Sequence, residues 1–167
     1  MEITRIDSFL AYWSRIRQRT TRVLKKIPPD KIDWSYAAGK WTLGDLIRHV
    51  AALERFMFAE TLLGRPSRYP GCGRELADGY DAVLAYYERM KDETVEILSA
   101  MPEERLLETC TTPGGADLPV WKWMRAMVEH EIHHRGQLYT YLGMLEVATP
   151  PLYGLTSEEV AAPRAGA

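Results

Sequence analysis

Four long stretches in which apolar residues recur every three or four positions constrain the fold of this 167-residue chain more than any other feature. They run from Ile6 to Ile27, from Leu43 to Met57, from Glu75 to Ala100 and from Asp117 to Leu145. Because an α-helix has about 3.6 residues per turn, this spacing places the apolar side chains of each stretch on one face. The sequence therefore predicts an all-α fold, a four-helix bundle that buries these faces in one core.

Residues at the ends of these stretches predict where the helices begin. Thr42 can cap the second helix, and Asp45, three positions on, complements the capping position and the positive end of the helix dipole. Asp117 is expected to cap the fourth helix in the same way, with Pro119 in its first turn. Before that helix, the β-branched residues at 111–112 could form a short extended piece.

Length and composition predict one domain. We expect it to span residues 1–160, with a proline-rich C-terminal end anchored by Leu152, Tyr153 and Leu155, and a disordered tail at 161–167. Hydrophobic residues make up 46% of the chain and charged residues 26%, which is a globular composition. The sequence shows no apolar signal core and no apolar run long enough to cross a membrane, so we expect a cytoplasmic protein.

The net charge of −2 gives the chain no overall attraction to nucleic acid or to an anionic membrane. The first predicted helix nevertheless carries a basic stripe on the face opposite its apolar one, formed by Arg15, Arg19, Arg22 and Lys26. Such a stripe can contact phosphates. Charge on the outer face of an amphipathic helix is more often only solvated, so we favour a solvated face and expect no nucleic-acid partner.

Three of the four histidines fall within five residues of the fourth predicted helix. His130 and His134 are one helical turn apart, so both rings project to the same side and can share one metal ion, as paired histidines do in zinc enzymes. His133 lies about 100° from His134 round the helix and is not expected to join them. The third ligand is then expected to be His49, near the centre of the apolar face of the second helix.

Three imidazoles among apolar side chains favour a metal site, because each unpaired buried polar group costs on the order of 1–3 kcal/mol and one divalent cation satisfies all three. We expect Zn²⁺ or Ni²⁺, with Fe²⁺, Mn²⁺ and Cu²⁺ as alternatives, and a coordination position left open for water or substrate. The alternative is a closed structural site with Cys72 or Cys110 as fourth ligand. Otherwise both cysteines are expected to be reduced thiols.

Two motifs carry a resemblance to a known family, Trp41-Thr-Leu-Gly-Asp-Leu-Ile-Arg-His49 and His130-Glu-Ile-His-His134-Arg-Gly-Gln-Leu138. With Tyr141-Leu-Gly-Met-Leu145 and the proline-rich end, they resemble the DinB/YfiT-like superfamily over nearly the whole chain. The resemblance implies an up-down-down-up bundle, often a homodimer, with a divalent metal held by the positions of His49, His130 and His134. Some relatives are transferases that use a low-molecular-weight thiol, or related isomerases. Others are assigned as metal-dependent hydrolases, and many have no known activity.

Two classes of function remain open. The first is a metal-dependent enzyme that activates a thiol or water at the open coordination position, as a thiol transferase or a hydrolase acting on a small molecule. The second is a non-enzymatic, metal-stabilised structural, sensor or stress-response protein. Asp45, Glu129 and Glu131 lie near the expected ligands in sequence and are candidates to orient the imidazoles. No catalytic residue beyond the metal can be assigned.

Overall fold

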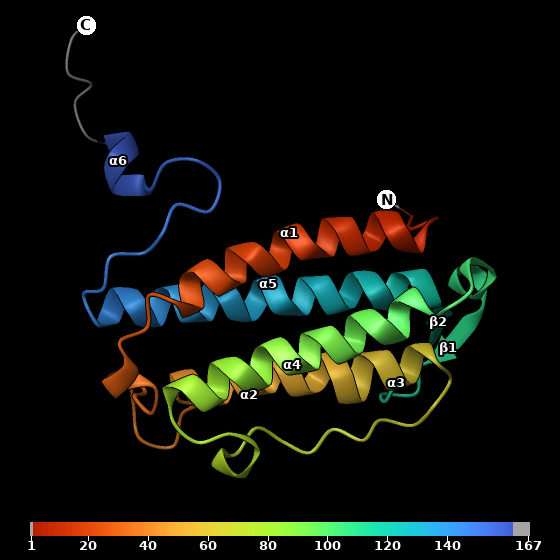
Figure 1. Ribbon diagram of the computed structural model, residues 1–167, viewed down its shortest axis with the longest axis horizontal. Helices are drawn as coiled ribbons and strands as arrows, with labels where there is room; N and C mark the ends of the chain where they lie inside the picture. Colours follow the sequence, from red (N-terminus) through yellow and green to blue (C-terminus); the bar gives the residue numbers. More distant parts are fainter. Residues whose placement is uncertain (1, 162–167) are drawn as a thin grey trace, which may run out of the picture.

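The computed structural model describes residues 2–161, which form the expected four-helix bundle (Figure 1). Its long helices are α1 (Ile6–Leu24), α2 (Leu43–Leu53) continued by a π-helical turn (Glu54–Phe58) and α3 (Ala59–Leu62), α4 (Tyr80–Ser99), and α5 (Val120–Met144). α2 and α4 lie side by side and run in the same direction, because the segment 63–79 returns along the bundle before α4 begins. α1 and α5 form the other pair, so the order is up-down-down-up.

Short elements connect the long helices. Three 3-10 turns (Pro29–Lys31, Arg74–Leu76 and Glu103–Leu107) lie in the connecting segments. Between α4 and α5, β1 (Thr109–Thr111) and β2 (Asp117–Pro119) pair antiparallel, and α6 (Ser157–Ala161) follows α5. Within the described residues, no helix is both long enough and apolar enough to span a membrane.

The core consists of the apolar faces that the sequence pattern predicts. The largest fully buried side chains come from every layer of the bundle and include Trp13, Leu46, Tyr87 and Met124. Burying one such side chain contributes roughly 1.5–3 kcal/mol relative to leaving it in water. The bundle therefore has an extensive core of its own, and that core holds the helices that carry the histidines.

The predicted cap of α2 is confirmed. Thr42 Oγ1 accepts a hydrogen bond from the Asp45 backbone N–H at 3.0 Å, and the Asp45 carboxylate accepts one from the Thr42 N–H at 2.9 Å. A cap of this kind stabilises a helix by about 1 kcal/mol. It fixes the start of α2 and hence the position of His49, two turns further on.

The other helix boundaries differ from the sequence expectations. α4 begins at Tyr80 rather than Glu75, because Gly79 has a positive φ of 81° that an α-helix cannot contain. The fourth helix begins at Val120, so the prediction that Asp117 caps it is wrong. Residues Asp117–Pro119 form β2 instead, since pairing with β1 satisfies their backbone better than an extra helical turn at the end of the bundle.

The C-terminal end is less firmly held than predicted. Leu152 is half-buried, but the side chains of Tyr153 and Leu155 are 73% and 64% exposed, so these two do not anchor the segment through burial. Tyr153 is held at its polar tip, where its hydroxyl accepts a hydrogen bond from Arg135 at 3.1 Å. Ala161 is the last residue of α6, and the rest of the expected tail lies outside the described residues.

Candidate metal centre

The three histidines singled out by the sequence lie together between α2 and α5. One ring nitrogen from each of His49, His130 and His134 lies within 4.8 Å of the other two. The Nε2 atoms of His49 and His130 are 3.2 Å apart. The ring centroid of His134 is 4.7 Å from that of His49 and 4.4 Å from that of His130. Two helices that are distant in the sequence thus bring three imidazoles to one point.

Two hydrogen bonds fix the orientation of these rings. The Nδ1 atom of His49 lies 2.7 Å from the hydroxyl oxygen of Tyr69, and the Nδ1 atom of His134 lies 2.7 Å from Oε1 of Gln137. Since the Gln137 oxygen can only accept, His134 must carry its proton on Nδ1. The same tautomer at His49 lets Tyr69 accept, and both rings then present the lone pair of Nε2 to the cluster.

The arrangement fits a divalent cation. Ligand nitrogens held about 2.0–2.1 Å from a tetrahedral ion are about 3.3 Å from one another, close to the 3.2 Å between His49 and His130. The Nδ1 atom of His130 is buried and has no hydrogen-bond partner among residues 2–156 and 159–161, and the Nε2 atom of the same ring contacts only another imidazole nitrogen, Nε2 of His49. A cation at the cluster would compensate all three imidazoles at once.

Burial keeps these imidazoles neutral. Burial first, and the neighbouring histidines second, lower the pKa of His49 to about 4 and that of His130 to about 3. Burial also lowers the pKa of His134, against a smaller opposite effect of Gln137. A neutral imidazole has the free lone pair that metal coordination requires, so the cluster is ready for a cation at neutral pH.

Aromatic rings surround the cluster. The indole of Trp41 lies 4.5 Å from the His49 ring between centroids and is 42% exposed, whereas His49 itself is only 8% exposed. On the inner side, Phe58 lies 5.7 Å from His130 and 4.6 Å from Trp123. The centre is therefore largely shielded from bulk water and lies one aromatic ring below the surface.

Other candidate ligands lie outside the centre. His133 is exposed, as expected, and is not part of the cluster. Cys72 and Cys110 are free thiols, and neither belongs to the group of potential ligand atoms. The structure therefore does not support a closed site with cysteine as fourth ligand. No further His, Cys, Asp or Glu of the described part of the chain joins the three histidines.

The carboxylates expected to orient the imidazoles do not do so. Asp45 completes the α2 cap and pairs with Arg48, and Glu129 pairs with Arg125 at the surface. Glu131 points into the core. Tyr69 and Gln137 orient the rings instead. Gln137 could have been found, since it lies three positions after His134 on one helix. Tyr69 lies in a loop that carries no periodic signal.

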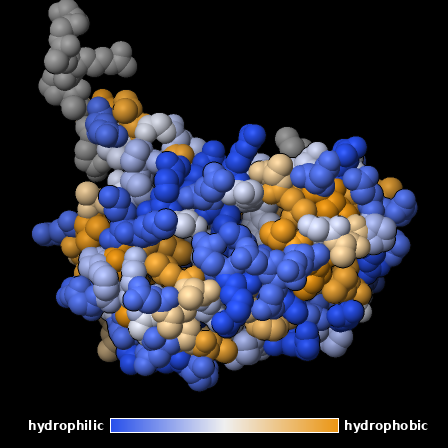
Figure 2. Space-filling view, viewed as in Figure 1, coloured by the Kyte–Doolittle hydropathy of each residue, from blue (hydrophilic) through white to orange (hydrophobic). Residues whose placement is uncertain are grey.

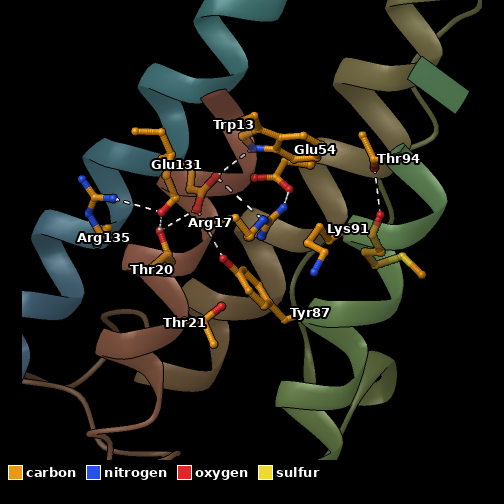
Figure 3. Close-up of polar contacts among 12 residues, drawn as sticks. Trp13, Arg17, Thr20, Thr21, Glu54, Tyr87, Lys91, Thr94, Glu131 and Arg135 are labelled. Carbon is orange, nitrogen blue, oxygen red and sulfur yellow. Dashed lines mark hydrogen bonds and ion pairs between the residues drawn. The ribbon is translucent and has the colours of Figure 1, made fainter. Parts of the chain in front are cut away.

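A buried polar network lies beside the centre, and its residues are shown in Figure 3. The carboxylate of Glu131, fully buried, accepts hydrogen bonds from Trp13 Nε1 at 3.0 Å, Thr20 Oγ1 at 2.5 Å and Tyr87 Oη at 3.3 Å. Arg17 is 2% exposed and forms an ion pair with the fully buried Glu54. Its Nε lies 3.8 Å from Glu131. The network joins side chains from all four long helical segments, and Glu131 directly follows His130 in the sequence.

Fold and site together define a class of small helical proteins: up-down-down-up bundles with a histidine cluster between the second and the last long helix. The family model of the DinB superfamily matches residues 12–138, and the chain belongs to this superfamily. YrdA of Bacillus subtilis (strain 168) is 21% identical over 154 residues, which cover 92% of this chain and 91% of YrdA.

Two solved structures show the same fold. A DinB-like protein from Bacillus cereus has a TM-score of 0.75 at 21% identity, with 90% of this chain and 99% of that chain covered. YfiT from Bacillus subtilis has a TM-score of 0.68 at 12% identity, with 89% and 91% covered. YfiT is described as a probable metal-dependent hydrolase with an unusual four-helix bundle topology.

Proposed function

We propose that this protein is a metal-dependent enzyme whose centre is formed by His49, His130 and His134. Convergence of three neutral imidazoles from facing helices carries the proposal, with the Nε2 atoms of His49 and His130 only 3.2 Å apart. Zn²⁺ and Ni²⁺ suit three imidazole ligands best. Such an ion, when bound, lowers the pKa of a coordinated water or thiol toward neutrality.

The residues around the histidines have separate roles in this proposal. Tyr69 and Gln137 hold the His49 and His134 rings by their Nδ1 atoms, which keeps both Nε2 lone pairs directed at one point. Burial raises the pKa of Tyr69, so its hydroxyl stays protonated at neutral pH and does not add a charge beside the centre. Trp41 lies between the centre and the solvent, where it can pack against a bound small molecule.

Two chemistries are compatible with the same centre. Hydrolysis by an activated water is supported by the description of YfiT as a probable metal-dependent hydrolase. Transfer of a low-molecular-weight thiol is supported by the membership of the chain in the DinB superfamily, since the resemblance of its motifs to the DinB/YfiT-like superfamily implies that some relatives use such thiols. In either case the substrate is a small molecule that enters past the exposed ring of Trp41.

The visible spectrum of the cobalt-substituted protein separates the two chemistries. Direct coordination of a thiol changes this spectrum, so a transferase should respond to at least one of a panel of low-molecular-weight thiols. A spectrum unchanged by every thiol would contradict the transferase and leave hydrolysis. Cobalt-treated His49→Ala is the control, since it should give no comparable spectrum at all.

Removal of the metal tests the enzymatic role against a purely structural one. The bundle has an extensive apolar core, so chelation should leave the helical circular-dichroism signal intact and lower the thermal midpoint only moderately. Loss of the helical signal on chelation would show that the ion holds the fold together, and the non-enzymatic alternative would then replace the proposal.

A further inference from the structure

A basic groove lies between α1 and α4, and none of its lining residues belongs to the histidine centre. Its volume is about 730 Å³. Figure 2 shows a hydrophilic area at the middle of the face on which α1 and α4 meet, with apolar areas to either side. The sequence pattern placed Arg15, Arg19 and Arg22 on a solvated outer face, but in the fold these side chains form one wall of a concave surface.

The groove is strongly positive although the whole chain has a net charge of −2. Besides the buried Arg17, five cations and one carboxylate line the groove, so its net charge is +4. The cations are Arg15, Arg19, Arg22, Lys25 and Lys91, and the carboxylate is Glu88. Glu88 pairs with Lys91 at 2.7 Å. Among residues 2–156 and 159–161, no carboxylate lies within ion-pair distance of Arg15, Arg19, Arg22 or Lys25.

Convergence from two helices distinguishes this groove from an ordinary charged helix face. Lys91 of α4 faces the cations of α1 across the groove, and Arg17 lies at its base, stacked 4.2 Å over the ring of Tyr87. Lys26, which belongs to the same sequence stripe, does not line the groove. A concave surface lined by charges of one sign concentrates the electrostatic potential and attracts counter-ions of high charge.

We propose that this groove binds a small molecule that carries two or more phosphate groups. A diphosphate has a charge of about −3 at neutral pH, which the +4 of the lining can neutralise. Arginine forks bind phosphate oxygens in pairs, and the volume lies within the usual range of small-molecule sites, roughly 300–1,000 Å³. The proposal is independent of the metal centre and of the reaction catalysed there.

A nucleic acid is the competing occupant. An extended polyanion needs a basic surface that continues along its length, whereas the cations here are gathered in one groove on a chain of net negative charge. The observations therefore favour a compact ligand.

Calorimetric titration of the full-length protein with inorganic pyrophosphate at low salt tests the proposal. We expect saturable binding at one site, weakened by about tenfold or more in the double variant Arg15→Gln/Arg22→Gln, because each substitution removes a charge-assisted contact. Both side chains are exposed, so the variant should keep its helical spectrum. Lys26→Gln is the matched control, an exposed cation two residues beyond the end of α1 and outside the groove, and should bind pyrophosphate like the wild type.

Several results would overturn the proposal. Absence of saturable pyrophosphate binding would do so. A loss of affinity in Lys26→Gln equal to that in the double variant would also do so, because it would indicate a general effect of charge and not a site in the groove. Binding that survives unchanged in the double variant would show that pyrophosphate does not bind in the groove. Tighter binding of a single-stranded oligonucleotide, with a steep salt dependence, would identify the groove as a nucleic-acid surface.

Discussion

Replacement of Glu131 by alanine should be the most destabilising single change to a charged residue in this protein. The Glu131 side chain is fully buried and serves as the acceptor for Trp13, Thr20 and Tyr87, three donors that are themselves almost completely buried. It also lies 3.8 Å from Arg17, whose other partner is Glu54. Removing the carboxylate leaves Trp13 and Tyr87 without an acceptor inside the bundle, whereas the Thr20 hydroxyl keeps the Ile16 carbonyl oxygen at 3.3 Å.

The structure sets the size of the effect. One orphaned buried donor costs about 1–3 kcal/mol, so the simple sum for two donors is roughly 2–6 kcal/mol. Water entering the space left by the side chain reduces this sum, and breaking a buried ion pair by removing one partner typically costs about 3–5 kcal/mol. We therefore expect Glu131→Ala to lower the free energy of unfolding by about 3–5 kcal/mol. Glu131→Gln keeps one acceptor oxygen and should cost less, about 1–3 kcal/mol.

Urea unfolding followed by circular dichroism measures both variants, with chelator present so that the neighbouring His130 has no influence through metal binding. Glu129→Ala is the matched control: it lies two positions away on α5, in an exposed pair with Arg125, and should change the free energy by no more than about 1 kcal/mol. If Glu131→Ala proved as mild as Glu129→Ala, the network would contribute nothing and the reasoning would fail. Should the alanine variant not fold, Glu131→Gln still gives a measurable difference.

The metal-free protein should lose stability as the pH falls from about 6.5 toward 4. Unfolded imidazoles have a pKa near 6.5, whereas the pKa values of His49 and His130 in the folded chain are about 4 and 3. Between these values the unfolded state binds more protons than the folded state, so the urea midpoint should fall as the pH is lowered. The control variant His133→Gln should show the same fall as the wild type. Midpoints independent of pH in this window would refute the burial argument. Tyr69→Phe should weaken zinc binding by about 10-fold or more in competition with a chelator, because His49 loses its orienting hydrogen bond, whereas the exposed Tyr12→Phe should have no effect. Equal affinity in both variants would show that Tyr69 does not position the ligand.

Helical periodicity predicted the bundle because each long helix buries a single face, and that face repeats every three or four residues along the sequence. Capping chemistry predicted the start of α2, where Thr42 and Asp45 satisfy each other locally. The same reasoning failed at Asp117, because the backbone of this residue pairs with β1 and not with the first turn of a helix. Local signals decide a boundary only where no tertiary partner competes for the same backbone groups.

The three histidines could be found from the sequence because the spacing of His130 and His134 fixes their common direction, and His49 was the remaining inward-facing imidazole. The buried polar network around Glu131 could not be found from the sequence. Arg17 and Glu131 are of residue types that normally lie at the surface, and only the packing of α1 against α5 shows that their charges face each other in the core.

The basic groove was hidden for a similar reason. A stripe on one helix does not reveal that Lys91 of another helix faces it, or that Lys25 lines the groove and Lys26 does not. Such convergence depends on how helices pack, which the periodicity of each helix alone does not specify.

Elemental analysis of the purified protein tests the central claim most directly, with His49→Ala and His133→Ala measured beside the wild type. The account predicts about one divalent cation per chain in the wild type and in His133→Ala, and nearly none in His49→Ala, since His49 belongs to the cluster and His133 does not. A wild-type protein that takes up no divalent cation, or a His49→Ala variant that retains its full content, would contradict the existence of the centre.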